Sequence, residues 1–252
     1  MGEVWPGAGR GRYRVELLGR FHVSADGQPL EVPVGTQRLI SKLALRGACG
    51  RSRLAGLLWP ETTEAKALAS LRTAIWRAGR IAPGLLLTGH DDVSLASDVE
   101  VDVSRLVEMA HEIMEGRRFV ELDEPRLHQV EEDLLPDWTD DWLIVDRERL
   151  RQLRLHVLES LSEQLLARGA FGMALEAAMI ALNADTLRES AHRAVMRVHV
   201  AEGNVLDARR AYAYCQALLR RELGVAPSAE TLDLARRWSL ERSAPAVPCR
   251  LR

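Results

Sequence analysis

The chain has 252 residues, of which 47% are hydrophobic and 28% are charged, and its formal net charge at pH 7 is −2. This length allows one large domain or two modest domains, each with its own buried core. The composition excludes a polycation, and no apolar run approaches the roughly 20 residues that cross a bilayer.

The N-terminal part of the sequence mixes short strands with short helices. Residues 1–12 are rich in glycine and arginine, lack the apolar segment of a secretory signal, and predict a flexible tail. Alternating apolar residues in "YRVELLG", "FHVSADG" and "PLEVP" predict three strands. Helices are then expected at about 36–46, 51–58 and 64–82. The stretch "LLLTGHDDVSLAS" predicts a hairpin of residues 85–87 and 93–95. This order over residues 13–103 predicts a winged helix-turn-helix domain.

The second half of the sequence, residues 104–240, predicts helices throughout, and residues 241–252 predict a second flexible tail. Small residues recur there with a period of 34: Ala167, Gly169, Ala174 and Ala177 correspond to Ala201, Gly203, Ala208 and Ala211. This is the period of the tetratricopeptide repeat, in which small residues let paired helices pack closely. The predicted fold is therefore mainly α with a small β component, a winged helix-turn-helix domain followed by an all-α, tetratricopeptide-like repeat domain.

Charge separates the two halves of the chain. Residues 36–82 contain nine Lys or Arg against two acidic residues, a net charge of +7. Residues 104–141 contain four Arg against twelve acidic residues, a net charge of −8. A locally basic helical unit suits the phosphate backbone of a nucleic acid.

The third predicted helix has two different faces. At about 100° per residue, one arc holds the apolar residues Leu68, Leu71, Ile75, Ala78 and Ala82. The opposite face holds Lys66, Thr73, Trp76, Arg77 and Arg80, flanked by Ser70 and Arg72. A plain interpretation is a solvated face with one arginine packed on the indole. The position before a hairpin favours a recognition helix, because a major groove admits an α-helix and arginine binds guanine with two hydrogen bonds.

The sequence suggests two classes of DNA contact. The candidates for base contact are Arg72, Thr73, Trp76, Arg77 and Arg80. The candidates for phosphate contact are Arg38, Lys42, Arg51, Arg53, Lys66, Ser70 and His90. Trp76 has alternatives, since it could contact a sugar or a thymine methyl group, a neighbouring protomer, or the sheet. The hairpin tip, His90-Asp91-Asp92, carries two acids that repel phosphate. The hairpin is therefore expected either to reach DNA only through His90 or backbone amides, or to miss DNA.

Trp138 and Trp142 lie four residues apart in "PDWTDDW". They are either core anchors that join the two domains, which is the commoner role, or an interaction hot spot. Asp140 or Asp141 is expected to cap the following helix, and the charged segment "DRERLRQLR" is expected to form a solvated helix face.

The sequence offers little support for catalysis. It lacks the motifs GxxxxGK(S/T), HExxH and GxSxG. Cys49, Cys215 and Cys249 are far apart without metal-ligand spacing, which favours a reducing cytosol. His192 and His199 are expected to have packing or surface roles. We therefore predict no enzyme activity, no cofactor and no metal site.

The order of these segments resembles the Streptomyces antibiotic regulatory proteins, in which an OmpR-type winged-helix domain precedes a bacterial transcriptional activator domain. The resemblance rests on "YRVELLGRFHVSADGQPLEVP", "GTQRLISKLAL", "LAGLLWPE", "ALASLRTAIWRAGRI" and "EVDVSRL" in the first half. In the second half it rests on "DLLPDWTDDWLIVDRERLRQLRLHVLESLSEQLLARG", "LRESAHRAVMRVHVAEGN" and "RRELGVAPSAET". Trp76 and Gly79 depart from the family's usual recognition helix, which leaves the operator sequence open.

The resemblance implies a cytoplasmic activator that binds double-stranded DNA at direct repeats near a promoter's −35 region. It implies side-by-side protomers on DNA, recruitment of RNA polymerase holoenzyme with its sigma factor, and target genes for antibiotic or other secondary-metabolite biosynthesis. The alternative is a helical-repeat adaptor whose winged helix docks protein rather than DNA. The acidic hairpin tip and the acidic segment favour that alternative.

Overall fold

The computed structural model describes residues 13–115 and 132–241. The predicted tail of residues 1–12 and all but the first residue of the predicted tail 241–252 lie outside these ranges. So do residues 116–131, which carry part of the predicted acidic segment.

The chain divides into two compact units. Within the described ranges, the first unit comprises residues 13–109 and 132–150, and the second comprises residues 110–115 and 151–241. The predicted domain boundary at residue 104 differs from this division, because residues 132–150 pack with the N-terminal elements.

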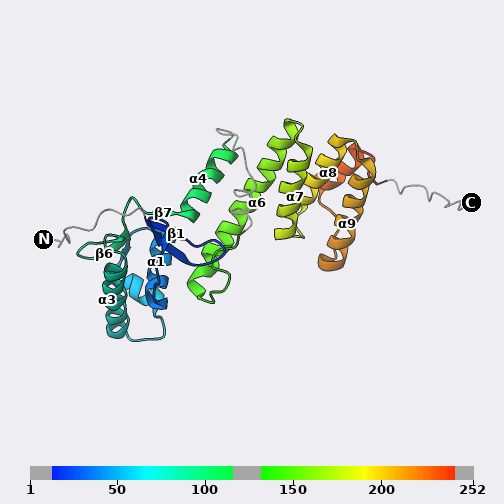
Figure 1. Cartoon of the computed structure of the whole chain (residues 1–252). Coiled ribbons are helices and arrows are strands. Elements are labelled where there is room, and N and C mark those ends of the chain that lie inside the picture. Colours follow the sequence, from blue (N-terminus) through cyan, green and yellow to red (C-terminus); the bar gives the residue numbers. More distant parts are fainter. Residues whose placement is uncertain (1–12, 116–131, 242–252) are drawn as a thin grey trace, which may run out of the picture. The chain divides into compact units, whose positions relative to one another are not determined.

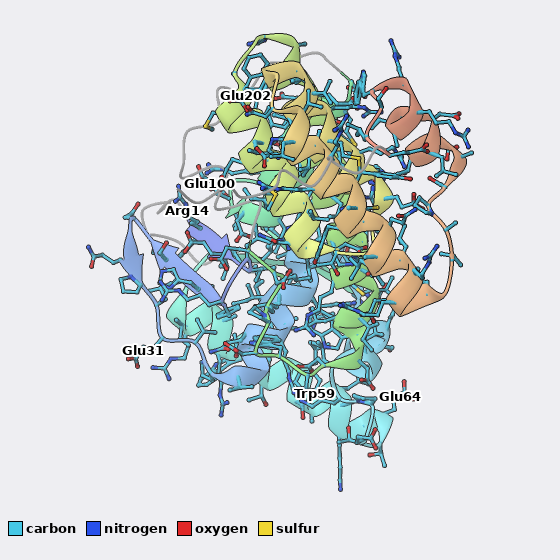
Figure 2. The ribbon with its side chains drawn as sticks, turned by 90° about the vertical axis from the view of Figure 1, so that its right-hand side faces the viewer. Arg14, Glu31, Trp59, Glu64, Glu100 and Glu202 are labelled. Atoms are coloured by element: carbon cyan, nitrogen blue, oxygen red, sulfur yellow. The ribbon has the colours of Figure 1, made fainter. Side chains whose placement is uncertain are left out.

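The first unit begins with a four-stranded sheet in the order β3-β2-β1-β7. Its strands are β1 (Tyr13–Glu16), β2 (His22–Ala25), β3 (Gln28–Pro29) and β7 (Glu100–Val101). β1 and β2 are antiparallel with Val15 opposite Val23, and both side chains are buried. β7 runs parallel to β1, where the Arg14 guanidinium lies 3.3 Å from the Glu100 carboxylate (Figure 2). The three predicted N-terminal strands are therefore present, and a fourth comes from farther along the chain.

A helix-turn-helix and a hairpin follow the first three strands (Figure 1). The elements are α1 (Val34–Arg46), β4 (Cys49–Gly50), α2 (Arg51–Leu58), α3 (Glu64–Ile81), β5 (Leu86–Thr88) and β6 (Asp92–Leu95). Their shared core includes Leu39, Leu54, Leu71 and Val93, all of which are buried. β6 lies between β4 and β5 in a three-stranded sheet. The predicted winged helix-turn-helix is confirmed, and α1 begins two residues before its predicted start because it follows directly after Pro33.

Residues 132–150 complete the first unit. Leu135 donates its backbone N–H to the carbonyl of Leu17 at 2.9 Å, and Gly19 donates to the carbonyl of Asp133 at 2.8 Å. Leu134, Leu135 and Leu143 are buried. The segment ends in a short 3-10 helix, η1 (Asp141–Leu143), and the first turns of α6 (Ile144–Ala167). These residues therefore belong to the core of the first unit rather than to the repeat unit.

Helix α4 (Asp102–Met114) starts at a half-buried carboxylate, that of Asp102. The Asp102 carboxylate accepts hydrogen bonds from the backbone N–H groups of Leu17 at 2.8 Å, Leu18 at 2.9 Å and Val103 at 2.7 Å. Burial raises the pKa of the Asp102 carboxyl, although these three donors act in the opposite direction. This carboxylate fixes the strand β1 to the beginning of α4.

The second unit consists of helical hairpins. Beyond residue 150 it contains the rest of α6, then α7 (Phe171–Ala184), α8 (Glu189–Glu202), α9 (Val205–Leu223) and α10 (Ala229–Arg237) (Figure 1). Gly169 and Gly203, one period apart, adopt positive φ angles of 75° and 88° where helices end. Ala174 and Ala208, also one period apart, are fully buried. The 34-residue recurrence therefore corresponds to repeated helix–turn–helix packing.

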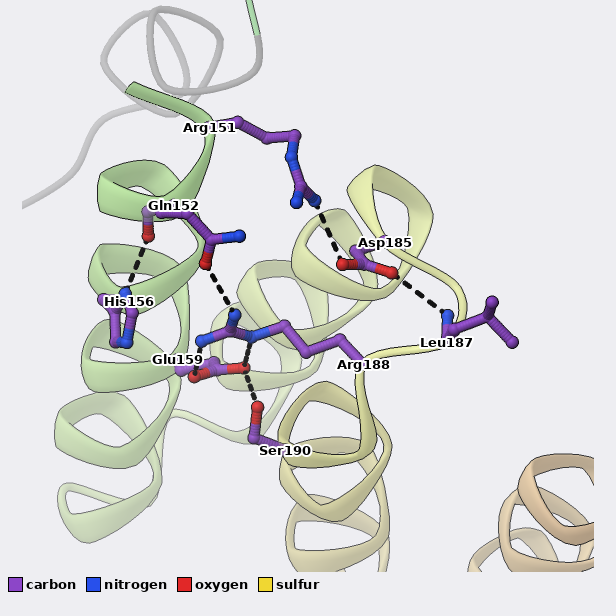
Figure 3. Close-up of polar contacts among 8 residues, drawn as sticks. All are labelled: Arg151, Gln152, His156, Glu159, Asp185, Leu187, Arg188 and Ser190. Carbon is purple, nitrogen blue, oxygen red and sulfur yellow. Dashed lines mark hydrogen bonds and ion pairs between the residues drawn. The ribbon is translucent and has the colours of Figure 1, made fainter. Parts of the chain in front are cut away.

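Charged side chains join α6 to the helices of the next hairpin (Figure 3). The Glu159 carboxylate accepts hydrogen bonds from the Arg188 guanidinium at 2.6 Å and 3.1 Å and from the Ser190 hydroxyl at 2.5 Å. Two further ion pairs join residues 34 positions apart, Arg151 with Asp185 at 3.0 Å and Glu163 with Arg197 at 2.8 Å. The part of "DRERLRQLR" in this unit is therefore not a plain solvated face.

His192 is buried, and its Nε2 lies 2.9 Å from the carbonyl oxygen of Thr186. Burial lowers the pKa of its imidazole. Across residues 13–115 and 132–241, no group of three or more His, Cys, Asp or Glu side chains is arranged to hold a metal ion. None of the helices in the described ranges has both the length and the apolar character needed to span a bilayer.

Candidate nucleic-acid interface

Helix α3 packs against the rest of the first unit mainly through alanines. Its most buried side chains are Ala67, Leu71, Ala74 and Ala78, whereas Leu68 and Ile75 of the predicted core face are only partly buried. The hydroxyl of Thr36 on α1 donates to the carbonyl of Ala74 at 3.4 Å. The core face is therefore centred on the alanines, slightly rotated from its predicted position.

The opposite side of α3 faces solvent. Lys66, Arg72, Thr73, Trp76, Arg77 and Arg80 are all exposed there, and Ser70 is partly buried. Trp76 exposes 59% of its surface, and the Arg80 guanidinium carbon lies 5.1 Å from its ring centroid. The Thr73 hydroxyl donates to the Ala69 carbonyl at 3.0 Å. We call Thr73, Trp76, Arg77 and Arg80 the recognition strip.

The cations of this face have no acidic partners within the described chain. Lys66, Arg72, Arg77 and Arg80 form no ion pair with any carboxylate of residues 13–115 or 132–241. Their charge is therefore not neutralised by a carboxylate of the described residues.

The cations of α1, in contrast, lie close to carboxylates of residues 140 and 146. The Arg38 guanidinium lies 3.0 Å from the Asp140 carboxylate, and that of Arg46 lies 2.9 Å from Asp146. Lys42 is 6% exposed, its ammonium lies 3.9 Å from the Asp146 carboxylate, and it lies 4.6 Å from the Trp142 ring centroid. Burial lowers the pKa of the Lys42 ammonium, although Asp146 acts in the opposite direction.

These contacts change the predicted set of phosphate-binding residues. Lys42 does not fit that role, because its charge is buried under an indole and against a carboxylate. Arg38 remains partly exposed but shares its charge with Asp140. The sequence does not predict Asp140 and Asp146 as partners of α1. It predicts a helix cap at Asp140 or Asp141, and a solvated face for "DRERLRQLR", which begins at Asp146.

The hairpin tip is held to helix α2. Arg51 donates its backbone N–H to the Asp91 carbonyl at 2.9 Å and a guanidinium N–H to the Gly89 carbonyl at 3.1 Å. His90 Nδ1 lies 2.8 Å from the Asp91 carboxylate, and both side chains are more than 90% exposed. Arg51 thus supports the hairpin, while His90 and the neighbouring acids project into solvent. Of the remaining phosphate candidates, Arg53 and Lys66 are exposed.

Both tryptophans of "PDWTDDW" pack inside the first unit. Trp138 stacks on Phe21 with ring centroids 6.0 Å apart, and Trp142 packs against the helix-turn-helix core. The Arg147 guanidinium fastens this segment by donating to the carbonyls of Leu134, Leu135 and Trp138. The structure thus places these tryptophans as packing residues, in the unit that carries the recognition strip.

The chain is similar to a known domain family and to a solved structure. Residues 127–237 match the family model of the bacterial transcriptional activator domain. Among solved structures, the chain is similar to Mycobacterium tuberculosis EmbR in complex with a low affinity phosphopeptide, with a TM-score of 0.75 and 17% sequence identity. The similarity covers 94% of this chain and 67% of that chain, and at this identity it shows a shared fold. No curated protein matches the chain.

The family model and the shared fold agree with the resemblance predicted from sequence. Residues 127–237 thus match a bacterial transcriptional activator domain, of the type found in the Streptomyces antibiotic regulatory proteins.

Proposed function

We propose that the protein activates transcription by binding specific DNA sequences, with helix α3 lying in the major groove. The observation that carries the proposal is the outer side of α3, where four cations without acidic partners in residues 13–115 and 132–241 lie on the same side as an exposed tryptophan. A major groove accepts an α-helix, and arginine binds guanine O6 and N7 bidentately. We assign base contact to Arg72 and the recognition strip.

Phosphate contacts would come from the rim of this helix-turn-helix. Arg53, Lys66 and Ser70 are accessible for that role, and His90 extends from the hairpin tip. Arg38 would also contact a phosphate, although its guanidinium is paired with the Asp140 carboxylate. Arg51 would act through the hairpin that it supports, and we leave Lys42 out because it is buried.

The activator domain supports the remaining steps of the proposal. Following the family resemblance, protomers would bind side by side on direct repeats near a −35 region and recruit RNA polymerase holoenzyme through its sigma factor. The target genes would be those of secondary-metabolite biosynthesis, and the site of action would be the cytoplasm.

The double variant Arg77→Ala/Arg80→Ala tests the proposal. Each bidentate arginine contact contributes about 1–3 kcal/mol to discrimination, so we expect operator affinity to fall at least about 30-fold. Because both side chains are exposed, helical circular dichroism should not change. The operator is first enriched from random duplexes, and affinity is measured by fluorescence anisotropy. A matched control, Arg220→Ala/Arg237→Ala, removes two exposed arginines of the second unit and should bind like wild type.

The adaptor function remains the second candidate, because Asp91 and Asp92 are exposed at the hairpin tip. Titration with random duplex DNA at several salt concentrations separates the two. Phosphate contacts predict that log K falls with log salt by about 0.9 per neutralised phosphate. A wild-type protein that binds no duplex at low salt would refute the DNA-binding proposal and favour the adaptor. A double variant that keeps full operator affinity would refute the placement of α3 in the major groove.

A further inference from the structure

The recognition strip has the length of a short DNA site. Residues 73 and 80 are seven positions apart on α3, and a helix rises 1.5 Å per residue. The strip therefore extends for about 10 Å, which corresponds to about three base-pair steps of 3.4 Å. Trp76 and Arg80 are one helical turn apart within the strip. The base pairs that they would face are therefore neighbours, or are separated by a single base pair.

Trp76 is the one large apolar side chain on the strip. It does not fill the core, since α3 packs through Ala67, Leu71, Ala74 and Ala78 on its other side. The indole instead forms a cation–π contact with Arg80, 5.1 Å from centroid to guanidinium carbon. Such a contact orients both groups before a ligand arrives, which lowers the entropy cost of binding.

The chemistry of the pair matches two neighbouring features of the major groove. The indole ring offers an apolar face, and the apolar group that DNA exposes in this groove is the C5-methyl of thymine. A guanidinium that stacks by one face keeps its N–H edge free, and that edge fits O6 and N7 of guanine.

We infer that Trp76 is a specificity-determining residue that contacts a thymine methyl group, next to a guanine bound by Arg80. The inference rests on the proposed DNA-binding function and deepens it. It names the bases that this part of α3 selects: a thymine, and a guanine one or two base pairs away.

The test removes single groups from both partners. Each thymine of the enriched operator is replaced in turn by deoxyuridine, which lacks only the C5-methyl, and each guanine by 7-deazaguanine, which lacks N7. Dissociation constants are measured for wild type, Trp76→Ala, Trp76→Phe and Arg80→Ala. Circular dichroism and melting temperature verify that each variant is folded.

Burial of one methyl group is worth about fourfold in affinity. We therefore expect one thymine whose replacement weakens wild type about fourfold and leaves Trp76→Ala unaffected, with Trp76→Phe in between. Replacing a guanine one or two base pairs away by 7-deazaguanine should weaken binding by wild type and leave binding by Arg80→Ala unaffected. The matched control, Tyr214→Ala, changes an exposed aromatic residue of the second unit and should keep the full methyl effect.

Two results would overturn the inference while leaving the proposed function intact. One is specific, salt-sensitive binding in which wild type responds to no thymine methyl group. The other is a Trp76→Ala variant that loses affinity equally for thymine and deoxyuridine operators, as a sugar or protein contact predicts. Wild type that binds no duplex would overturn both the inference and the proposed function.

Discussion

Lys42 and Arg80 show how differently two cations of one basic segment can be used. Lys42 is buried between Trp142 and Asp146, whereas Arg80 lies on an exposed indole and has no carboxylate partner in the described chain. A buried ammonium that loses its partner is strongly destabilising, while replacement by an apolar group of similar size is often neutral. Removing the Asp146 carboxylate should therefore lower the free energy of unfolding much more than replacing Lys42 by an apolar residue.

We predict that Asp146→Ala destabilises the protein far more than Lys42→Met. Removing Asp146 leaves the Lys42 ammonium buried without a carboxylate and should lower the free energy of unfolding by about 3 kcal/mol. Lys42→Met keeps the aliphatic stem under Trp142, and Asp146 keeps Arg46, so the change should be within about 1 kcal/mol. Urea unfolding followed by circular dichroism measures both, and equal losses would contradict the assigned burial of this pair.

Among the secondary-structure elements, α6 and α8 are joined by a carboxylate rather than by apolar packing alone (Figure 3). Burial by itself would raise the pKa of Glu159, but the hydrogen bonds from Arg188 and Ser190 outweigh it and hold the pKa below its usual 4.5. The ionised form is therefore the one that folding favours. Its contribution to stability is complete above pH 4.5 and is lost as the pH falls towards the folded-state pKa.

We predict that Glu159→Gln removes part of this acid sensitivity. At pH 7 the variant should lose about 1–3 kcal/mol, because charged hydrogen bonds to Arg188 and Ser190 become neutral or are lost. Below pH 4.5 its stability should approach that of wild type. Chemical unfolding at several pH values between 7 and 3 measures the difference. As a control, Glu230→Gln changes an exposed carboxylate of α10 and should keep the wild-type pH profile. A constant difference for Glu159→Gln at every pH would contradict the prediction.

At the scale of the whole molecule, the first unit is built from two stretches of the chain that are separated in sequence. Residues 132–150 supply Leu134, Leu135 and Leu143, which are 3%, 0% and 0% exposed, to a fold whose helix-turn-helix lies in residues 34–81. Burial of each leucine contributes about 2 kcal/mol. The stability of the first unit should therefore depend on sequence that lies beyond the predicted boundary.

We predict that a fragment of residues 1–150 melts at a higher temperature than a fragment of residues 1–115. The longer fragment keeps the three buried leucines and the carboxylates that pair with α1. Within it, Leu143→Ala should lower the melting temperature, whereas Val145→Ala, at a side chain that is 66% exposed, should not. Scanning calorimetry gives both comparisons, and equal melting temperatures for the two fragments would show that residues 132–150 contribute nothing to the first unit.

Much of this protein could be predicted from the sequence because the relevant signals are local. Apolar periodicity placed α1, α2 and α3 within two residues of their ends, and it separated the buried side of α3 from the side that carries Trp76 and Arg80. The recurrence of Ala174 at Ala208 indicated repeated helical packing in the same way. Each of these patterns repeats within one helix or one hairpin, so neighbouring residues suffice to define it.

The tertiary structure alone decided which cations are free. Arg46 pairs with Asp146 across 100 positions of sequence, and Lys42 is buried against the same carboxylate, whereas the arginines of α3 meet no acid in the described chain. Spacing along a helix determines which way a side chain faces, but it carries no information about which distant segment will cover that face. The sequence thus determined the elements and the two sides of α3, and the packing of residues 132–150 determined which positive charges of α1 are paired with carboxylates.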